Sequence, residues 1–195
     1  MELRSTRLSL RSWQHHDDVT ADAWPPYHDP FEPIWNLSRQ SGSWAAGFEF
    51  SGGRRTWAVD TLDGRLAGRI SLREVDERRS SARLGITFGS SYVGKGMGSE
   101  ALALFIDYYF NDLSFALLLL DVAGPNRRAI HCYEHLGFSY AGNDWRCAGY
   151  AFDRHLLDNP DYAHVRRFFR QGPRCLEVQF FEMELRKDDW LRSHG

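Results

Sequence analysis

A glycine-rich loop between an expected strand and an expected helix constrains this chain more than any other feature. Leu84–Phe88 is rich in apolar and β-branched residues, which predicts a strand. Alternating glycines follow at Gly94, Gly96 and Gly98. Apolar residues then recur on one helical face, namely Ala101, Leu104, Phe105, Tyr108 and Tyr109. Glycine lets the backbone approach a ligand, and free N–H groups gather at a helix start, so this arrangement favours binding of a phosphate group.

Two well-known phosphate loops fit this segment only in part. The nucleotide P-loop, G-x-x-x-x-G-K-[ST], fits Gly89, Gly94 and Lys95, but Gly96 stands where a hydroxyl should bind Mg²⁺. The dinucleotide fingerprint G-x-G-x-x-G begins correctly at Gly94 and Gly96, but Ser99 replaces its last glycine. A glycine-rich turn without any ligand is the remaining alternative.

A second pattern follows the loop at a suitable distance. Leu117–Val122 is a short apolar run, which predicts a buried strand. Asn126 then precedes a short helix that carries Ala129 and Tyr133 and ends in Leu136-Gly137-Phe138. Asn126 at the helix start is expected to be its N-cap.

The loop and this second pattern together resemble the GNAT superfamily of acetyl-CoA-dependent N-acetyltransferases. The pyrophosphate loop of that superfamily reads [QR]-x-x-G-x-[GA]. Gly96 and Gly98 fit it, whereas Val93 departs from its first position. The resemblance covers roughly Leu3–Phe138 and is strongest over Leu84–Phe138.

The resemblance implies an α+β (mixed α/β) GNAT-like fold, with a central, mostly antiparallel twisted sheet, a splayed strand pair and flanking helices. The opening, Thr6–Arg11, and the loop Gly94–Ala101 look most like the branch that includes the ribosomal-protein N-terminal acetyltransferases. The strands expected from the residues are Arg7–Trp13, Arg55–Asp60, Arg65–Glu74, Ala82–Phe88, Leu117–Val122, Asp144–Arg154 and Val178–Leu185. A turn is expected at Thr61–Gly64, and helices near His15–Asp18 and Ile34–Trp44.

The length of 195 residues suits a single domain. We expect one GNAT-like domain over 1–195 with an insertion around 144–175, because the family core needs only a short connection between its last two strands. Within it Asp158–Arg170 is expected to be loop-like and then helical. This insertion could cap the acceptor site or form a dimer contact, so a homodimer is one expectation.

Composition bounds the location and the partners. The net charge is −2 with no basic block, so nothing electrostatic favours nucleic acid. The three cysteines, Cys132, Cys147 and Cys175, are odd in number and widely spaced, which favours reduced thiols in a cytoplasmic protein. No signal peptide or membrane-spanning segment is expected. The run His15–Asp18 suggests a metal site or a solvated helix start; we favour the helix start and expect no metal.

The resemblance assigns acetyl-CoA as cosubstrate and an amine as acceptor. The pantetheine arm should follow Leu84–Phe88, beside Leu117–Val122, and one N–H from Thr87, Phe88 or Gly89 should polarise the thioester carbonyl. The residues expected to bind the cofactor are Thr87, Phe88, Val93, Gly94, Lys95, Gly96, Met97, Gly98, Ser99, Asn126, Ala129 and Tyr133.

Catalysis needs a proton donor for the leaving thiolate and an acceptor for the amine proton. Tyr133 stands at the family's tyrosine position, and a phenol with a pKa of about 10 can protonate a thiolate whose conjugate acid has a pKa of about 8.5. Glu74 and His28 are candidate bases, although the amine could also arrive deprotonated. The aromatic and proline-rich segment Trp24–Trp35 is either a wall of the acceptor pocket or a local hydrophobic plug.

The expected function is therefore transfer of an acetyl group to a primary amine, on a protein N-terminus or a small molecule, by direct attack on the thioester. One alternative is a non-catalytic acyl-CoA-binding sensor, which Val93 favours slightly. Another is a P-loop nucleotide-binding protein, because Leu117–Asp121 resembles the second signature of that class. An acyl group other than acetyl, such as succinyl, also stays open.

Overall fold

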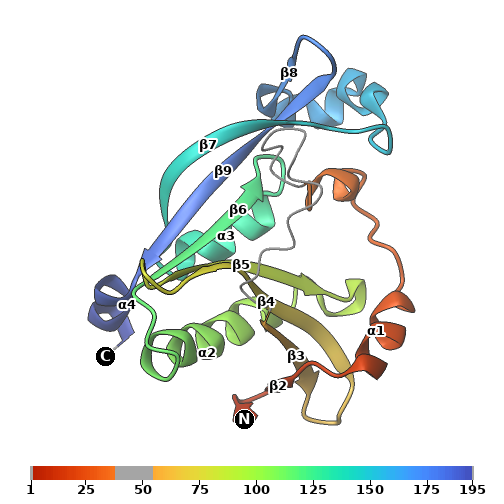
Figure 1. Cartoon of the computed structure of the whole chain (residues 1–195). Coiled ribbons are helices and arrows are strands. Elements are labelled where there is room, and N and C mark those ends of the chain that lie inside the picture. Colours follow the sequence, from red (N-terminus) through yellow and green to blue (C-terminus); the bar gives the residue numbers. More distant parts are fainter. Residues whose placement is uncertain (1, 38–54, 195) are drawn as a thin grey trace.

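The computed structural model describes residues 2–37 and 55–194 of the chain. Its strands are β1 (Glu2–Arg4), β2 (Leu8–Ser12), β3 (Arg55–Thr61), β4 (Leu66–Asp76), β5 (Ser81–Phe88), β6 (Leu117–Ala123), β7 (Ser139–Cys147), β8 (Phe169–Gln171) and β9 (Leu176–Arg186). They form one sheet in the order β1-β2-β3-β4-β5-β6-β9-β7, and β8 pairs with β9 (Figure 1). Every pair is antiparallel except β5 with β6, which confirms the expected mostly antiparallel α+β fold.

Helices flank this sheet. The α-helices are α1 (His15–Asp22), α2 (Met97–Asn111), α3 (Arg127–His135) and α4 (Lys187–His194), and the 3-10 helices are η1 (Glu32–Ile34), η3 (Ser90–Tyr92), η4 (Arg154–Asp158) and η5 (Pro160–Phe168). None of the helices in the described residues is both long enough and apolar enough to cross a membrane.

Strands β5 and β6 separate after a short ladder, as the resemblance predicted. Their parallel pairing runs only from Ser81 with Leu117 to Arg83 with Leu119. Both strands continue beyond this point, β5 to Phe88 and β6 to Ala123, and Figure 1 shows them diverging. The backbone groups of this part of β5 that face the gap therefore lack the partners that a continuous sheet would supply.

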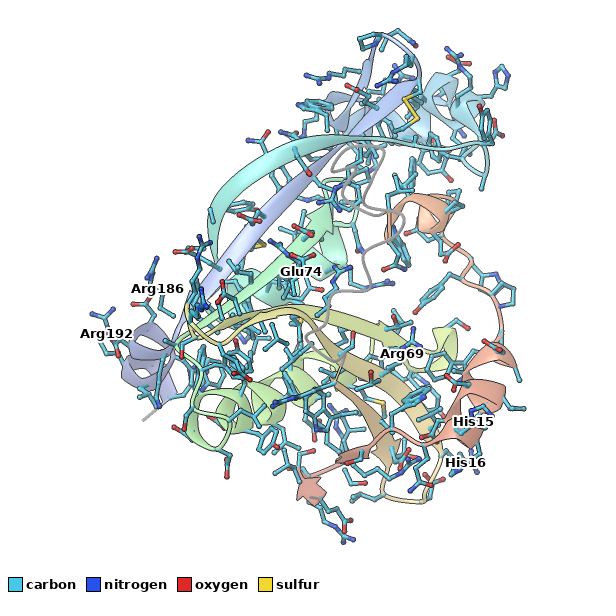
Figure 2. All side chains as sticks on the ribbon, in the orientation of Figure 1. His15, His16, Arg69, Glu74, Arg186 and Arg192 are labelled. Atoms are coloured by element: carbon cyan, nitrogen blue, oxygen red, sulfur yellow. A yellow bond between two sulfur atoms is a disulfide. The ribbon has the colours of Figure 1, made fainter. Side chains whose placement is uncertain are left out.

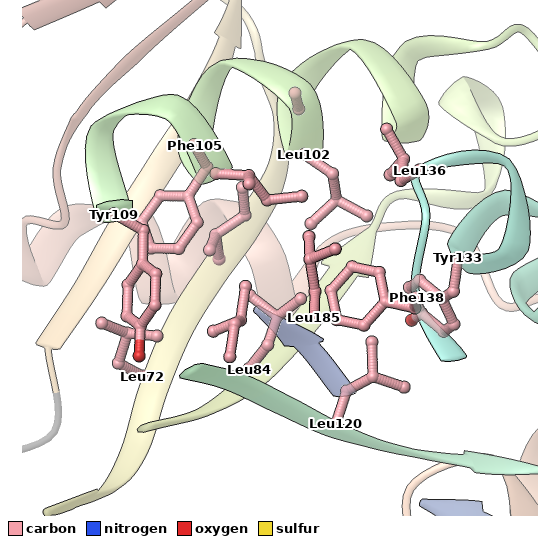
Figure 3. Packing of buried hydrophobic residues seen from close by; sticks show 14 of the residues in the cluster. Leu72, Leu84, Leu102, Phe105, Tyr109, Leu120, Tyr133, Leu136, Phe138 and Leu185 are labelled. Carbon is pink, nitrogen blue, oxygen red and sulfur yellow. The ribbon is translucent and has the colours of Figure 1, made fainter. Parts of the chain in front are cut away.

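The main core lies between α2 and one face of the sheet. Figure 3 shows Leu102, Phe105 and Tyr109 of α2 beside Leu72 and Leu84 of the strands. Burying each large apolar side chain contributes about 1.5–3 kcal/mol relative to exposure. The predicted helical face is confirmed in part, because Ala101, Phe105 and Tyr109 are buried whereas Leu104 and Tyr108 are half-buried. The buried face also includes Leu102, Ile106 and Phe110, and the helix begins earlier than the predicted periodicity, at the glycine loop.

A second, smaller core joins the aromatic segment to the expected insertion. Phe31 and Ile34 pack in it with Phe152, Val165 and Phe168. The expected strand Asp144–Arg154 is wrong in its bounds, because β7 begins at Ser139 and ends at Cys147. Gly149, at φ +77°, lies just beyond the end of that strand.

The segment Asp158–Arg170, which we expected to be loop-like and then helical, contains a 3-10 helix and no α-helix. Helix η4 ends at Asp158, and η5 begins at Pro160, whose backbone nitrogen carries no hydrogen. Of the helix expected over Ile34–Trp44, residues up to 37 hold only the end of η1, and the remainder lies outside the described residues.

A disulfide joins Cys147 at the end of β7 to Cys175 just before β9, with Cα atoms 5.8 Å apart. The prediction of reduced thiols is therefore wrong for this pair, while Cys132 is free. The two cysteines meet because β7 and β9 pair in antiparallel fashion, with Cys147 opposite Glu177. They are 28 residues apart in the sequence, and this spacing alone does not predict a disulfide.

The His15–Asp18 run is a helix start, as expected. Asp17 accepts a hydrogen bond from the Gln14 N–H at 2.8 Å and binds Arg11 at 2.7 Å. The hydrogen-bonded Arg11 guanidinium lowers the pKa of the Asp17 carboxyl. Asp17 therefore forms an ion pair with Arg11 that stabilises the structure. The described residues hold no cluster of three or more potential metal ligands.

Candidate active site

The glycine loop presents free N–H groups at the start of α2. Gly94 and Gly96 have φ of +77° and +76°, a conformation that other residues rarely adopt, and Gly96 is the N-cap. The Glu100 N–H is bonded to the Gly96 carbonyl at 3.1 Å, so the N–H groups of the first turn before it lack helical partners. They are available to an anion at the positive end of the helix dipole.

The N-terminal strand region fixes this loop in place. The Arg7 guanidinium donates to the Lys95 carbonyl at 3.0 Å and to the Glu100 carboxylate at 2.6 Å. Glu100 also accepts from the Ser5 hydroxyl at 2.8 Å. The hydrogen bond between Arg7 and the loop backbone restricts the loop before any ligand arrives.

A cavity of about 660 Å³ opens between the separated strands. The loop, the free edge of β5, the end of β6 and the start of α3 contribute to its wall. All residues expected to bind the cofactor line it except Lys95, which is exposed, and Met97, which packs against the core. The lining residues from that prediction are Thr87, Phe88, Val93, Gly94, Gly96, Gly98, Ser99, Asn126, Ala129 and Tyr133.

The strand register narrows the choice of backbone donor for the thioester. The Gly89 N–H donates to the Ala67 carbonyl at 2.9 Å, so it points toward β4. Backbone groups alternate along a strand, and Thr87 therefore also points toward β4. The N–H groups of Ile86 and Phe88 face the gap toward β6. Of the three predicted donors only Phe88 keeps a suitable direction, and Ile86 is an additional donor that sequence reasoning missed.

Helix α3 is capped at both ends by the residues of the second sequence pattern. The Asn126 side chain accepts from the Ala129 N–H at 3.2 Å, which confirms the predicted N-cap. At the other end Gly137 has φ +89°, and the Phe138 N–H donates to the Tyr133 carbonyl at 3.0 Å. With the bond from Gly137 to Glu134 at 3.0 Å, this is a Schellman cap.

Tyr133 is held by this cap. Its ring packs against that of Phe138, with centroids 5.8 Å apart, which is the apolar contact that accompanies a Schellman cap. Its side chain lines the cavity although the residue is only 8% exposed. Burial raises the pKa of Tyr133 above its ordinary value, so the phenol keeps its proton at neutral pH.

Cys132, beside Tyr133, also lines the cavity, with its sulfur 3.1 Å from the Ser99 hydroxyl. Burial raises the pKa of the Cys132 thiol. The thiol is therefore mainly protonated at neutral pH and is a weak nucleophile there.

The two candidate bases do not lie in the cavity wall. Glu74 sits in an irregular part of β4, and its carboxylate accepts from Arg83 at 3.0 Å (Figure 2). His28 is exposed and is not a lining residue. The structure thus brings Tyr133 to the cofactor residues but leaves both Glu74 and His28 outside.

An ionic network that the sequence did not reveal lies where β5 and β6 part. Arg83, with a side chain only 5% exposed, donates to Asp121 at 2.7 Å, to Glu182 at 2.8 Å and to Glu74. Asp121 lines the cavity and also lies 3.4 Å from Arg146. The sequence signal was an aspartate in the otherwise apolar β6, which we had considered only as part of a nucleotide signature.

The aromatic segment contributes both to the cavity wall and to a hydrophobic core. Tyr27, Glu32 and Trp35 line the cavity, whereas Phe31 and Ile34 belong to the second core. The Tyr27 hydroxyl also donates to the Phe88 carbonyl, which ties this segment to the free edge of β5.

Residues 7–139 match the acetyltransferase (GNAT) domain family. The chain belongs to the GNAT acetyltransferase family. Spermidine N(1)-acetyltransferase from Escherichia coli K12 is 39% identical over 84 residues, which are 43% of this chain and 45% of that enzyme. The putative ribosomal N-acetyltransferase YdaF from Bacillus subtilis is 30% identical over 80 residues, 41% of this chain and 44% of that protein. The chain spans less than half the length of these curated relatives.

The solved structures agree in fold. Spermidine/spermine N-acetyltransferase from Vibrio cholerae, solved with manganese ions, has a TM-score of 0.66 at 18% identity, covering 97% of this chain and 98% of that chain. The spermidine N-acetyltransferase from the same organism, solved with CoA and spermine, has a TM-score of 0.64 at 20% identity, covering 96% and 99%. A spermidine acetyltransferase and a putative ribosomal acetyltransferase both match this chain. The comparisons therefore show the family but do not show to which branch of it the chain belongs.

Family membership overturns the P-loop alternative, and the loop gives the physical reason. A P-loop needs Ser or Thr at position 96, where this chain has a left-handed backbone. Asp121, the acid of the apparent second signature, is bound to Arg83.

Proposed function

We propose that this GNAT chain transfers an acetyl group from acetyl-CoA to an amine by direct attack on the thioester. One observation carries the proposal. A single cavity joins the phosphate-binding loop at one end of β5 to the gap beside β6, and Tyr133 lines the same cavity. The cofactor loop, the free edge of β5 and the proton donor Tyr133 therefore all face the same cavity.

Each part of the cavity supplies one requirement of the reaction. The N–H groups at the start of α2 hold the pyrophosphate, and the unpaired edge of β5 pairs with the amide groups of the pantetheine arm. An N–H from Ile86 or Phe88 polarises the thioester carbonyl and stabilises the oxyanion that develops there. Tyr133 donates its proton to the departing thiolate of CoA.

The amine proton needs a different acceptor from those first considered. Glu32 lines the cavity and makes no ion pair with a described residue. Its carboxylate is therefore better placed than Glu74 or His28 to take the proton, directly or through water.

Several finer features belong to the same proposal. The acceptor is a primary amine on a small molecule or a protein N-terminus. The enzyme is cytoplasmic and acts as one domain, in which the insertion around 144–175 supports the acceptor side through the second core. A homodimer through that insertion is compatible with the proposal, and no nucleic acid, membrane or metal takes part in it.

The first test is thermal unfolding with acetyl-CoA, CoA or Mg·ATP, followed by mass spectrometry of amines incubated with acetyl-CoA. A ligand at 100 times its Kd stabilises the native state by about 2.7 kcal/mol, which a melting curve resolves. We expect stabilisation by both CoA ligands, none by Mg·ATP, and a mass increase of one acetyl group on an amine. CoA binding without acetylation of any amine would favour the sensor alternative instead.

A further inference from the structure

Two buried donors in the cavity wall lack hydrogen-bond partners. Within the described residues, the buried side-chain atoms without a partner are Nε1 of Trp35 and Nη2 of Arg146. Both residues line the cavity, and both atoms can only donate. A buried donor without a partner destabilises a protein, so each of these two N–H groups needs an acceptor oxygen, from a bound ligand or from water.

Arg146 is a nearly buried lining residue whose guanidinium is fixed by its neighbours. Its side chain is 4% exposed; Nη1 donates to the Leu37 carbonyl at 2.7 Å, and Nε lies 3.2 Å from the Asp144 carboxylate. The guanidinium stacks 4.0 Å from the centre of the Phe180 ring. Nη2 lies 3.4 Å from Asp121 but makes no hydrogen bond to a described residue. The guanidinium is therefore held by Leu37, Asp144 and Phe180, and its Nη2 has an ion-pair contact with Asp121 but no hydrogen bond.

Strand β4 adds further positive charge to the same wall. Arg69, Ser71 and Arg73 are two residues apart, so they share one face of the strand, and all three line the cavity. Among the described residues, the carboxylate paired with Arg73 is that of Asp121, 4.0 Å away. Arg69 stacks over Trp13 at 5.4 Å and makes no ion pair with a described residue (Figure 2). Arginine stays charged in proteins, so an anion would compensate both side chains.

The carboxylates near this wall do not cancel that charge where the cavity is open. Glu74, Glu182 and Asp144 bind arginines but are not lining residues. The acidic lining residues are Glu32 and Asp121, and Asp121 is already bound by Arg83. The described lining therefore carries more arginine than carboxylate, with Arg69, Arg73, Arg128 and Arg146 against Glu32 and Asp121.

We propose that the acceptor amine carries an oxyanion, a carboxylate or a phosphate, which binds Arg146 and Arg73 and accepts a hydrogen bond from Trp35. This inference rests on the proposed acetyl transfer and specifies its acceptor. An oxyanion matches the fork of an arginine and satisfies both orphan donors. A polyamine, the acceptor named for several relatives, brings only donors and positive charge to the same wall.

Matched pairs of acceptors test the proposal. We would compare kcat/KM for L-alanine with L-alaninamide, for β-alanine with β-alaninamide, and for O-phosphoethanolamine with ethanolamine, with spermidine as the polycation. The amine of an amino acid amide is the weaker base, so intrinsic reactivity at neutral pH favours the amide. We expect the opposite order, with the anionic member of at least one pair preferred by about tenfold or more. The pairs also separate carboxylate from phosphate.

Arg73→Gln is the central variant because this side chain is 47% exposed and only loosely paired, so the fold should tolerate it. It should remove most of the preference for the anionic acceptor by lowering kcat/KM for the anionic member of a pair far more than for its neutral partner. Arg186→Gln is the matched control, since Arg186 is exposed, pairs with Glu184 and does not line the cavity (Figure 2). It should leave the preference unchanged.

A binding measurement decides the question if no amine in the panel reacts. Inorganic phosphate and succinate would be added to the protein, with and without CoA, against chloride at equal ionic strength. A rise in melting temperature that Arg73→Gln abolishes would support the oxyanion site. No rise, together with no acceptor preference, would overturn it, and so would faster acetylation of spermidine or of the neutral partners. Failure of the proposed function looks different, because then neither CoA binding nor acetylation of any amine is seen.

Discussion

At the scale of single residues, Tyr133 shows how a structural motif and a chemical role coincide. The Schellman cap fixes its carbonyl, Phe138 fixes its ring, and burial keeps its hydroxyl protonated. The Leu136–Phe138 segment, which is part of the pattern that resembles the family, therefore has a structural role. It ends the helix one turn after the tyrosine and supplies the aromatic ring against which the tyrosine packs.

Replacing Tyr133 with Phe should reduce kcat by about 100-fold or more, because general acid catalysis contributes about 10²–10⁴. The ring contact with Phe138 survives, so the fold and the Kd for CoA should change little. Steady-state kinetics and calorimetric titration with CoA measure both quantities. An unchanged kcat would remove Tyr133 from the mechanism and leave it as a packing residue.

The pH dependence of the same residue follows from its burial. Burial favours the neutral phenol, so the pKa of Tyr133 lies above the ordinary value of about 10. The proton is therefore present at every lower pH, and Tyr133 should cause no loss of kcat as the pH rises to about 10. A pH profile of wild type and Tyr133→Phe checks this. An alkaline limb below about pH 9 that is present only in the wild type would contradict it.

Arg83 is the residue whose loss should cost the most stability. It is almost fully buried and neutralises Asp121, Glu182 and Glu74 at once. Arg83→Met removes the cation that these three carboxylates share, although Asp121 keeps Arg146 3.4 Å away, so the free energy of unfolding should fall by about 3–5 kcal/mol. Urea unfolding measures the loss. The exposed pair of Arg186 and Glu184 is the comparison, and Arg186→Gln should change stability by about 1 kcal/mol or less.

At the scale of elements, local sequence signals predicted the site better than its surroundings. The loop and the capped α3 each depend on residues close in sequence, such as Gly96 and Asn126, whereas the free edge of β5 was expected only from the family resemblance. The ionic network at Asp121 depends on β4, β5, β7 and β9 meeting, and no local pattern encodes that meeting. Gly149 just beyond β7 and Pro160 at the start of η5 are local signals for these boundaries, but the apolar pattern used to predict the elements does not contain them.

The two glycines of the loop should respond differently to the same substitution. Gly96 needs a left-handed backbone, so Gly96→Ala should cost about 1–2 kcal/mol of stability and weaken CoA binding. A Cβ on Gly98 would contact nothing within 4 Å and its φ is ordinary, so Gly98→Ala should be nearly neutral for stability. Melting curves with and without CoA compare them. Equal behaviour of the two variants would contradict the assignment of Gly96 as the strained N-cap.

At the scale of the whole molecule, two separate hydrophobic cores support different parts of the cavity. The main core packs α2 and α3 against the sheet, and the smaller core joins the aromatic segment to the region that follows β7, where we propose that the acceptor binds. The disulfide between Cys147 and Cys175 closes the insertion at its base, directly beside Arg146. Substitutions that destabilise the smaller core should therefore weaken binding of the acceptor more than binding of CoA.

Opening this disulfide should test that division. It spans 28 residues, and a loop of this size accounts for about 3–4 kcal/mol on the chain-entropy scale. Cys147→Ser should lower the free energy of unfolding by about that amount and raise the KM for the acceptor, while the Kd for CoA stays within about twofold. Reductant should bring the wild type to the stability of the variant and leave the variant unchanged. Equal weakening of CoA and acceptor binding would show instead that the two cores act as one unit.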